Sequence, residues 1–273
     1  MGLRVNTNIA ALNAARTLQR STLDLNRSLE RLSSGLRINK ARDDAAGLAI
    51  AENFRSVVRG TQVAQRNAQD GIALVQTAEG GLSTVADIVQ RMRELAVQSA
   101  NGTLSNANRT SLQGEVTQLI AQIGAIATNT EFNGVAVLDS TLVTTLQVGA
   151  RNGQTIALDL STFRSRPQDI GVNTVDISTQ AGAQTALTQL DTAVNNINTR
   201  RATLGALQNR IEFTVQTLQI QEENSAFAES QIRDADIARE TIQFTRNQIL
   251  LSAGTSVLAQ SNVIPQTALQ LLG

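Results

Sequence analysis

Two pairs of adjacent carboxylates are the side chains whose type and spacing come nearest to acid–base or metal chemistry. They are Asp43–Asp44 and Glu222–Glu223. Adjacent residues on a helix point about 100° apart, so such a pair does not converge on one ion. The sequence contains no His and no Cys, which excludes His-based triads, His metal ligands and thiolate chemistry. We therefore interpret Asp43–Asp44 as a helix cap and Glu222–Glu223 as part of a solvated helix face.

An enzyme remains only a remote alternative. Composition alone leaves room for a carboxylate-dependent hydrolase, such as a two-carboxylate glycosidase. The sequence has no Trp and no Tyr on which a sugar ring could stack, and its pattern predicts no globular cleft. We therefore expect no catalytic residue, no metal site and no cofactor.

The composition favours long helices that pack along narrow contact lines. Apolar residues make up 41% of the chain, but aromatic residues only 2%, so Ala, Leu, Val and Ile must fill the core. The only two prolines, Pro167 and Pro265, leave long stretches free to be helical.

The charges and the apolar runs exclude several kinds of partner. Lys plus Arg and Asp plus Glu number 23 each, and no basic run is present that would attract nucleic acid. Zero net charge removes one barrier to self-association. No apolar run is long enough to cross a membrane, and we expect no Sec-type signal peptide. Taken alone, these features suggest a cytoplasmic protein.

The stretch from residue 29 to 56 organises the predicted fold. Leucines spaced by four and three residues end a first helix, and Ser33-Ser34-Gly35 then weakens it. After a polar joint, Asp43–Asp44 can start a second helix. The pattern therefore predicts helix, joint and long helix in that order.

The middle of the chain is predicted to hold this long helix and two further helices. Residues 45–100 form the longest, spanning roughly 80 Å, and residues 109–128 return along it after the turn at Asn101-Gly102-Thr103. Residues 184–232 hold a heptad pattern typical of a coiled coil. We interpret Gly71, Gly80 and Gly81 as close-packing points on a neighbouring backbone, although a helix break at Gly80–Gly81 is the alternative.

Between these helices the pattern changes period. Residues 140–162 alternate apolar and polar side chains around Asn152-Gly153, which predicts a β-hairpin. Residues 163–180 are irregular. The fold class is therefore mainly α, with long antiparallel coiled-coil helices formed by the N- and C-terminal halves and a small β-hairpin region.

The two ends of the chain carry narrow apolar lines that bury too little surface to be stable alone. We interpret these as an assembly seam, meaning helix faces that become ordered when partners pack on them. An ordinary helical bundle is the alternative. The predicted seam residues are Val5, Ile9, Leu12, Leu25, Leu29, Leu32, Ile237, Phe244, Leu251 and Leu258.

Several motifs resemble those of bacterial flagellin, in the same order. They are VNTNIAALNA, ARDDAAGLAIA, QRMRELAVQSANGT, LQVGARNGQTIALDL, RATLGALQNRIE and VLAQSNVIPQTALQLLG. The resemblance covers nearly the whole chain except about residues 163–186, where most flagellins hold a large variable outer domain. It implies a structural subunit that self-assembles into the helical flagellar filament for swimming motility.

The resemblance also implies a division into domains. Residues 1–43 and 234–273 would form a terminal helical pair, which lines the inner tube and is disordered in the free monomer. Residues 44–233 would form a helical-bundle core with the hairpin, and no large variable outer domain would be present. The chain would be exported to the extracellular flagellum through a type III channel without a cleaved signal.

The family also implies partners. Besides the chain itself, as a helical homopolymer, these are an export chaperone, the filament cap protein, the hook-associated junction proteins and, in a host, Toll-like receptor 5. Arg91, Leu95 and Glu115 match the footprint of that receptor in flagellins. No nucleic acid and no membrane insertion are expected. A hook-filament junction protein, which has similar ends, is the alternative function.

Overall fold

The computed structural model describes the backbone of residues 7–270 and the side chains of residues 7–263. Within this range the chain is mainly helical, as predicted. Its elements divide into two compact units. The first unit comprises Met1–Ser56 with Asn224–Gly273, and the second comprises Val57–Glu223. The long helices α2 (Ala45–Ala100) and α5 (Gln180–Arg233) have residues in both units.

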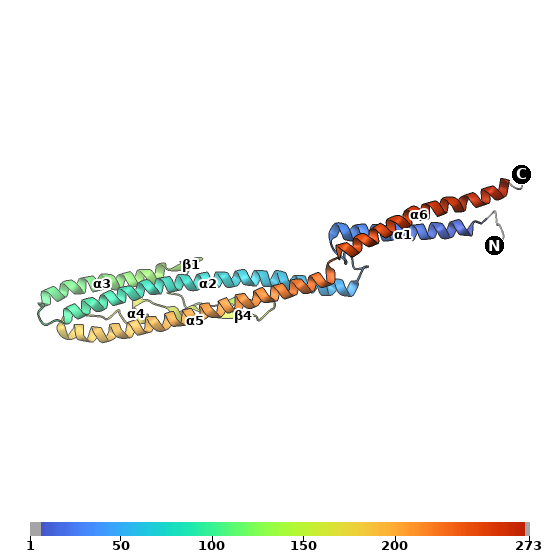
Figure 1. Ribbon diagram of the computed structural model, residues 1–273. Coiled ribbons are helices and arrows are strands. Elements are labelled where there is room, and N and C mark those ends of the chain that lie inside the picture. The colour runs from blue at the N-terminus through green and yellow to red at the C-terminus, as the bar shows by residue number, and fades with distance from the viewer. Residues whose placement is uncertain (1–6, 271–273) are drawn as a thin grey trace. The chain divides into compact units, whose positions relative to one another are not determined.

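The first unit is built on two helices that lie side by side (Figure 1), α1 (Ile9–Ser34) and α6 (Ile237–Gln270). Helix α1 starts at the side chain of Asn8, which accepts a hydrogen bond from the backbone N–H of Ala11. It ends at Gly35, which adopts the left-handed conformation with φ of 72°. The weak point predicted at Ser33-Ser34-Gly35 is thus confirmed as the end of the helix.

The joints between helices in the first unit pair with each other. Leu36 and Asp234 form an isolated antiparallel β-bridge. On either side of it, the N–H of Arg37 donates to the carbonyl of Arg233 over 2.7 Å and the N–H of Ala235 donates to the carbonyl of Gly35 over 2.9 Å. Backbone hydrogen bonds therefore hold the α1–α2 joint to the α5–α6 joint.

The second unit packs α3 (Asn106–Asn129) against parts of α2 and α5 (Figure 1). Helices α2 and α5 are antiparallel, as predicted, because polar contacts join residues of rising number on one to residues of falling number on the other. These pairs are Gln62–Glu222, Glu79–Arg201 and Arg93–Asp191. The apolar core between the three helices includes Val89, Met92, Ile123, Leu190 and Ile197, all fully buried.

Four short strands and two short helices complete the second unit. Strands β1 (Glu131–Phe132) and β2 (Val135–Ala136) form one antiparallel pair, and β3 (Val143–Gln147) and β4 (Thr155–Asp159) form the other. The second pair is the predicted hairpin, with Leu146 opposite Ile156 in its register. A 3₁₀ helix, η1 (Leu160–Phe163), and helix α4 (Pro167–Ile170) follow.

Glycines in α2 let the hairpins approach the helix. A Cβ atom at Gly71 would overlap the side chain of Leu146, and one at Gly81 would lie 2.7 Å from the side chain of Leu138. Both are close-packing points, but they meet side chains and not the neighbouring backbone that was predicted. The helix does not break there. Gly80 was wrongly predicted as such a point, because its Cβ position meets nothing within 4 Å. Gly60 was missed, and a Cβ atom there would lie 2.8 Å from Cβ and 3.2 Å from Cα of Ala150.

The segment 163–180, predicted to be irregular, is only partly so, because Phe163 ends η1, residues 167–170 form α4, and α5 begins at Gln180. Its residues 164–177 form a buried strap. Ile170, Val172 and Ile177 are almost fully buried against the three-helix core. The guanidinium of Arg200, on α5, donates to the carbonyls of Arg164 and Asp169 and to the hydroxyl of Ser165. Burial lowers the pKa of Arg200, and the nearby Asp169 carboxylate opposes that shift.

Candidate assembly surfaces

The α1–α6 seam, as the structure has it, repeats every seven residues on both helices. Its positions follow from burial at alternating spacings of three and four. On α1 they are Ala14, Leu18, Ser21, Leu25, Ser28 and Leu32, and on α6 they are Glu240, Phe244, Asn247, Leu251, Gly254, Leu258 and Ser261.

Three contacts fix the register of this seam. The side-chain nitrogen of Asn8 donates to the carbonyl of Ser261 over 2.7 Å. The side chain of Leu18 lies against Gly254, where a Cβ atom would be 3.1 Å from it. Arg31 and Glu240 form an ion pair at 3.7 Å between Nη1 and Oε2. The helices therefore run antiparallel.

Polar residues occupy the deepest positions of this seam. Among the residues of α1 and α6 whose side chains are described, only Ser21, Ser28, Asn247 and Ser261 are buried. The leucines and Phe244 on the seam are only half-buried. The pair, as far as its side chains are described, therefore lacks a hydrophobic core of its own, since fully buried apolar side chains supply most of the stability of a helix pair.

The predicted seam residues fall into two groups. Five lie on the α1–α6 seam and are half-buried: Leu25, Leu32, Phe244, Leu251 and Leu258. Four lie on outer faces with about half of their surface exposed: Ile9, Leu12, Leu29 and Ile237. Val5 lies outside the described residues. Sequence reasoning missed the small and polar seam residues, although their seven-residue recurrence at 14, 21, 28 and at 247, 254, 261 is visible in the sequence.

The outer face of α6 carries an open apolar groove of about 450 Å³. It is lined by Thr241, Ile242, Thr245, Arg246, Ile249 and Leu250. The hydroxyls of Thr241 and Thr245 donate to helix carbonyls one turn earlier, at 2.7 and 2.9 Å. These hydroxyls are therefore satisfied within the helix. Ile242 and Ile249 are 63% and 64% exposed.

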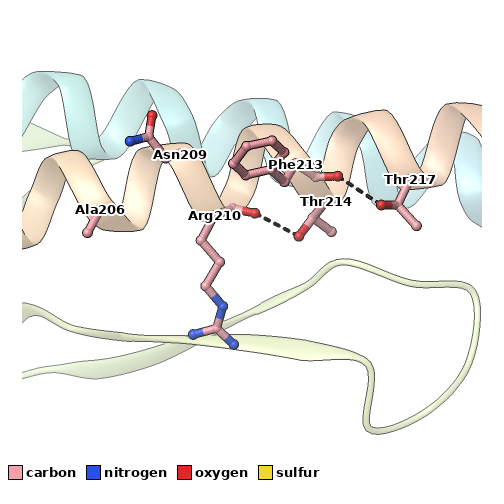
Figure 2. A pocket seen from close by; sticks show the side chains of 6 residues that line it. All are labelled: Ala206, Asn209, Arg210, Phe213, Thr214 and Thr217. Carbon is pink, nitrogen blue, oxygen red and sulfur yellow. Dashed lines mark hydrogen bonds between the residues drawn. The ribbon is translucent and has the colours of Figure 1, made fainter.

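A second groove, of about 610 Å³, lies on α5 within the second unit (Figure 2). It is built in the same way, since the hydroxyls of Thr214 and Thr217 donate to the carbonyls of Arg210 and Phe213 over 2.9 Å. The phenyl ring of Phe213 is 67% exposed. Aromatic residues are enriched in contact surfaces between proteins, so this groove is a candidate for one.

The acidic pair at the α1–α2 joint caps backbone groups. An oxygen of Asp44 accepts the N–H of Gly47 over 2.8 Å at the start of α2. Asp43 turns back and accepts the N–H groups of Lys40 and Asn39 at 3.0 and 3.3 Å. These bonds, chiefly the one from Lys40, lower the pKa of the Asp43 carboxyl. Both carboxylates are thus structural, and only Asp44 is a helix cap.

Two kinds of site are absent from the described part of the chain. Within residues 7–270, three or more His, Cys, Asp or Glu side chains do not come together as metal ligands would. A membrane-spanning helix would need a longer apolar run than any helix in the same range provides.

Two family models match the chain, one in each half of the sequence. The model for the bacterial flagellin N-terminal helical region matches residues 5–142, and the model for the bacterial flagellin C-terminal helical region matches residues 187–272. The chain belongs to the bacterial flagellin family. Flagellin is the filament subunit of the bacterial flagellum, an extracellular structural protein rather than an enzyme.

Similar flagellins align over nearly their full length. The flagellin of Halalkalibacterium halodurans is 45% identical over 269 residues, which cover 98% of this chain and 99% of that protein. The flagellin of Bacillus subtilis is 41% identical over 303 residues, covering 99% and 100%. This is a short-form flagellin, because residues 143–186 hold only the hairpin, two short helices, the strap and the start of α5.

Solved structures agree with this assignment. The crystal structure of Bacillus cereus flagellin is 34% identical, covers 56% of this chain and 88% of that chain, and has a TM-score of 0.50. A flagellar hook-associated protein from Vibrio parahaemolyticus has a TM-score of 0.57 over 71% of this chain and 99% of that chain. Its identity is 15%, so it shares the fold alone. The sequence therefore favours flagellin over the junction-protein alternative.

The three residues predicted to form a receptor footprint lie at two depths. Arg91 on α2 donates to Glu115 on α3 and to Glu94, each over 3.0 Å. These carboxylates raise the pKa of Arg91. Leu95 is only 1% exposed and belongs to the three-helix core. The surface of this flagellin thus presents Arg91 and Glu115, with Leu95 beneath them.

Proposed function

We propose that this flagellin polymerises with copies of itself through the outer faces of α1 and α6, which pack as an inner tube. The observation that carries the proposal is the composition of the pair. Its buried positions are polar, whereas Leu12 and Leu23 on α1 and Ile249 and Val257 on α6 are each more than half exposed. Packing against a neighbouring pair would bury these side chains and supply the missing hydrophobic stabilisation.

The contrast between polar buried positions and exposed apolar side chains in this pair also supports the proposed division into domains. Residues 1–43 and 234–273 would be the part that orders on assembly, and residues 44–233 the part that is folded beforehand. A segment that buries too little apolar surface alone becomes ordered when a partner completes that surface. In contrast, the second unit contains two apolar clusters of fully buried side chains.

Electron microscopy of the purified full chain, with seed filaments added, tests the proposal. We expect long uniform tubes from the natural sequence. Ile242→Ser and Ile249→Ser together should raise the subunit concentration needed for growth, because each removes an exposed apolar side chain from the α6 groove. Gln243→Ser and Gln248→Ser change exposed polar residues of the same helix and serve as the matched control. Short stubs from the natural sequence would favour a junction protein.

Contacts with a second copy would also use the α5 groove of the second unit. The groove has an exposed aromatic ring and an apolar lining, and a homopolymer offers it a copy of the same chain at high local concentration. Phe213→Ser should therefore weaken growth on seeds. The measurement is the critical concentration, and unfolding of the free monomer is the control for damage to the fold.

The other partners of this flagellin are proposed from the family. An export chaperone would cover the apolar groove of α6 before assembly, and the filament cap protein and hook-associated junction proteins would meet the same ends of the chain in the flagellum. Competition between a purified chaperone of this class and seed filaments for the free monomer would test the first contact. Ile249→Ser should weaken both interactions.

In a host, Arg91 and Glu115 would contact Toll-like receptor 5. Both are about half exposed, and Leu95 would support the helix surface from below. A reporter assay with soluble monomer should give a signal, and Arg91→Ala should reduce it. Arg93→Ala is the matched control, because Arg93 pairs with Asp191 on α5 instead. Absence of a signal from the natural monomer would contradict the proposal.

A further inference from the structure

The side-chain nitrogen of Asn247 is one of two buried atoms in the α1–α6 pair that lack a hydrogen-bond partner among the described residues. The other is Nε of Arg31, whose Nη1 pairs with Glu240. Asn247 is 4% exposed, and its Nδ2 atom has no hydrogen-bond partner among the described residues. The other buried polar seam residues are serines, whose small hydroxyl can rotate toward a nearby carbonyl. A carboxamide is larger and needs partners for two N–H bonds.

The register indicates which residue of α1 lies level with this nitrogen. Between the Leu18–Gly254 contact and the Arg31–Glu240 ion pair, the antiparallel register brings Asn247 level with Leu25. An aliphatic side chain accepts no hydrogen bond. Burial without a hydrogen bond is unfavourable, so the pair must lose stability whenever it closes over this amide.

The rest of the seam shows that packing does not require this loss of stability at position 247. Phe244 and Leu251, one turn away on either side of Asn247, are apolar, and the heptad repeat would accept a leucine at position 247 as well. The pair is therefore less stable with Asn247 than the same backbone would be with an apolar residue there.

We propose that Asn247 holds the α1–α6 pair below the stability needed to close on its own, so that closure awaits the packing of a second copy. The inference rests on the proposed function, because a second copy must supply the additional burial. Asn247 acts as a positioning residue for assembly. It couples the ordering of both chain ends to the addition of a subunit, which suppresses filaments that start without a seed.

Two substitutions in the full chain test this role. Asn247→Ala removes the amide without adding volume, and Asn247→Leu replaces it with a side chain that fits the repeat. Both also raise helix propensity, so the controls are Asn262→Ala and Asn262→Leu. Asn262 is an exposed asparagine on the same helix, which makes the controls report propensity alone.

The readouts are protease cleavage of the chain ends and far-ultraviolet circular dichroism in the free monomer, followed by the critical concentration on seeds. Relative to the Asn262 controls, we expect both Asn247 variants to slow cleavage of the ends and to raise helicity. The critical concentration should fall by roughly tenfold, and growth without seeds should appear.

Two results would overturn the inference. Asn247 variants that match their Asn262 controls would show that the amide does not limit closure. Ends that become ordered while growth on seeds is lost would show that the amide has a partner in the filament. Failure of the natural sequence to extend seeds would instead contradict the proposed function, and the cleavage assay on the monomer would still test Asn247.

Discussion

The side chain of Leu18, on α1, lies directly against Gly254, on α6. A Cβ atom at Gly254 would be 3.1 Å from Cδ1 of Leu18, which is tighter than an ordinary van der Waals contact. The glycine therefore allows the leucine to fill the seam, and one large residue is matched by one without a side chain.

Replacing Gly254 should open this seam. We expect Gly254→Val to cost about 1–3 kcal/mol through overpacking and to raise the critical concentration for filament growth by roughly tenfold or more. The control is the double variant with Leu18→Ala, which removes the atoms that the new side chain meets. Growth that is restored in the double variant would confirm the contact, whereas an equal defect in both would contradict it.

Much of the fold could be predicted from the sequence because long helices have strong periodic signals. The end of α1 at Gly35 and the hairpin around Asn152-Gly153 follow from local turn chemistry, and the structure has both. The buried strap could not be predicted, since its burial depends on Arg200 and on the α3 side chain Gln113, which bonds to the backbone of Ile177 over 2.7 Å. Such contacts between distant residues leave no periodic signal.

The assembly surfaces could be predicted only in part, for a related reason. Searching for apolar residues finds Leu25 and Phe244, but it also selects Ile9 and Leu29, which point outward. The residues at the centre of the pair are polar or small, and Asn247 is among them. An apolar pattern alone therefore cannot distinguish the face that meets α6 within one chain from the face that would meet a second copy.

Two adjacent glycines in α2 offer a matched test of packing against helix propensity. Gly80→Ala should stabilise the chain by up to about 1 kcal/mol, because alanine favours the helix and its Cβ meets nothing within 4 Å. Gly81→Ala should destabilise it by about 1–2 kcal/mol net, since its Cβ would lie 2.7 Å from Leu138. Thermal unfolding followed by circular dichroism measures both, and equal effects would contradict the argument.

The stability of the strap should depend far more on Arg200 than on the adjacent Arg201. Arg200→Leu leaves the carbonyls of Arg164 and Asp169 without their donor, and we expect a loss of about 2–4 kcal/mol. Arg201→Leu removes only a partly exposed ion pair with Glu79 at 3.7 Å, so less than about 1 kcal/mol is expected. Chemical denaturation of the monomer gives both values. A similar loss in both variants would show that the strap is not held by Arg200.

The joint at Asp43 should open in acid. Its backbone hydrogen bonds lower the carboxyl pKa below the ordinary value of 3.8, so they favour the charged, folded form. This stabilisation is fully present above pH 3.8 and is lost as the pH falls through the lower folded pKa. Hydrogen exchange at the amides of Asn39 and Lys40 measures this stabilisation, as a protection factor that should hold at about pH 5 and decline in stronger acid.

Asp43→Ala should remove that protection at every pH. Asp44→Asn should leave it in place, since asparagine caps α2 as well as aspartate does. Protection that persists in Asp43→Ala would show that other contacts hold the joint.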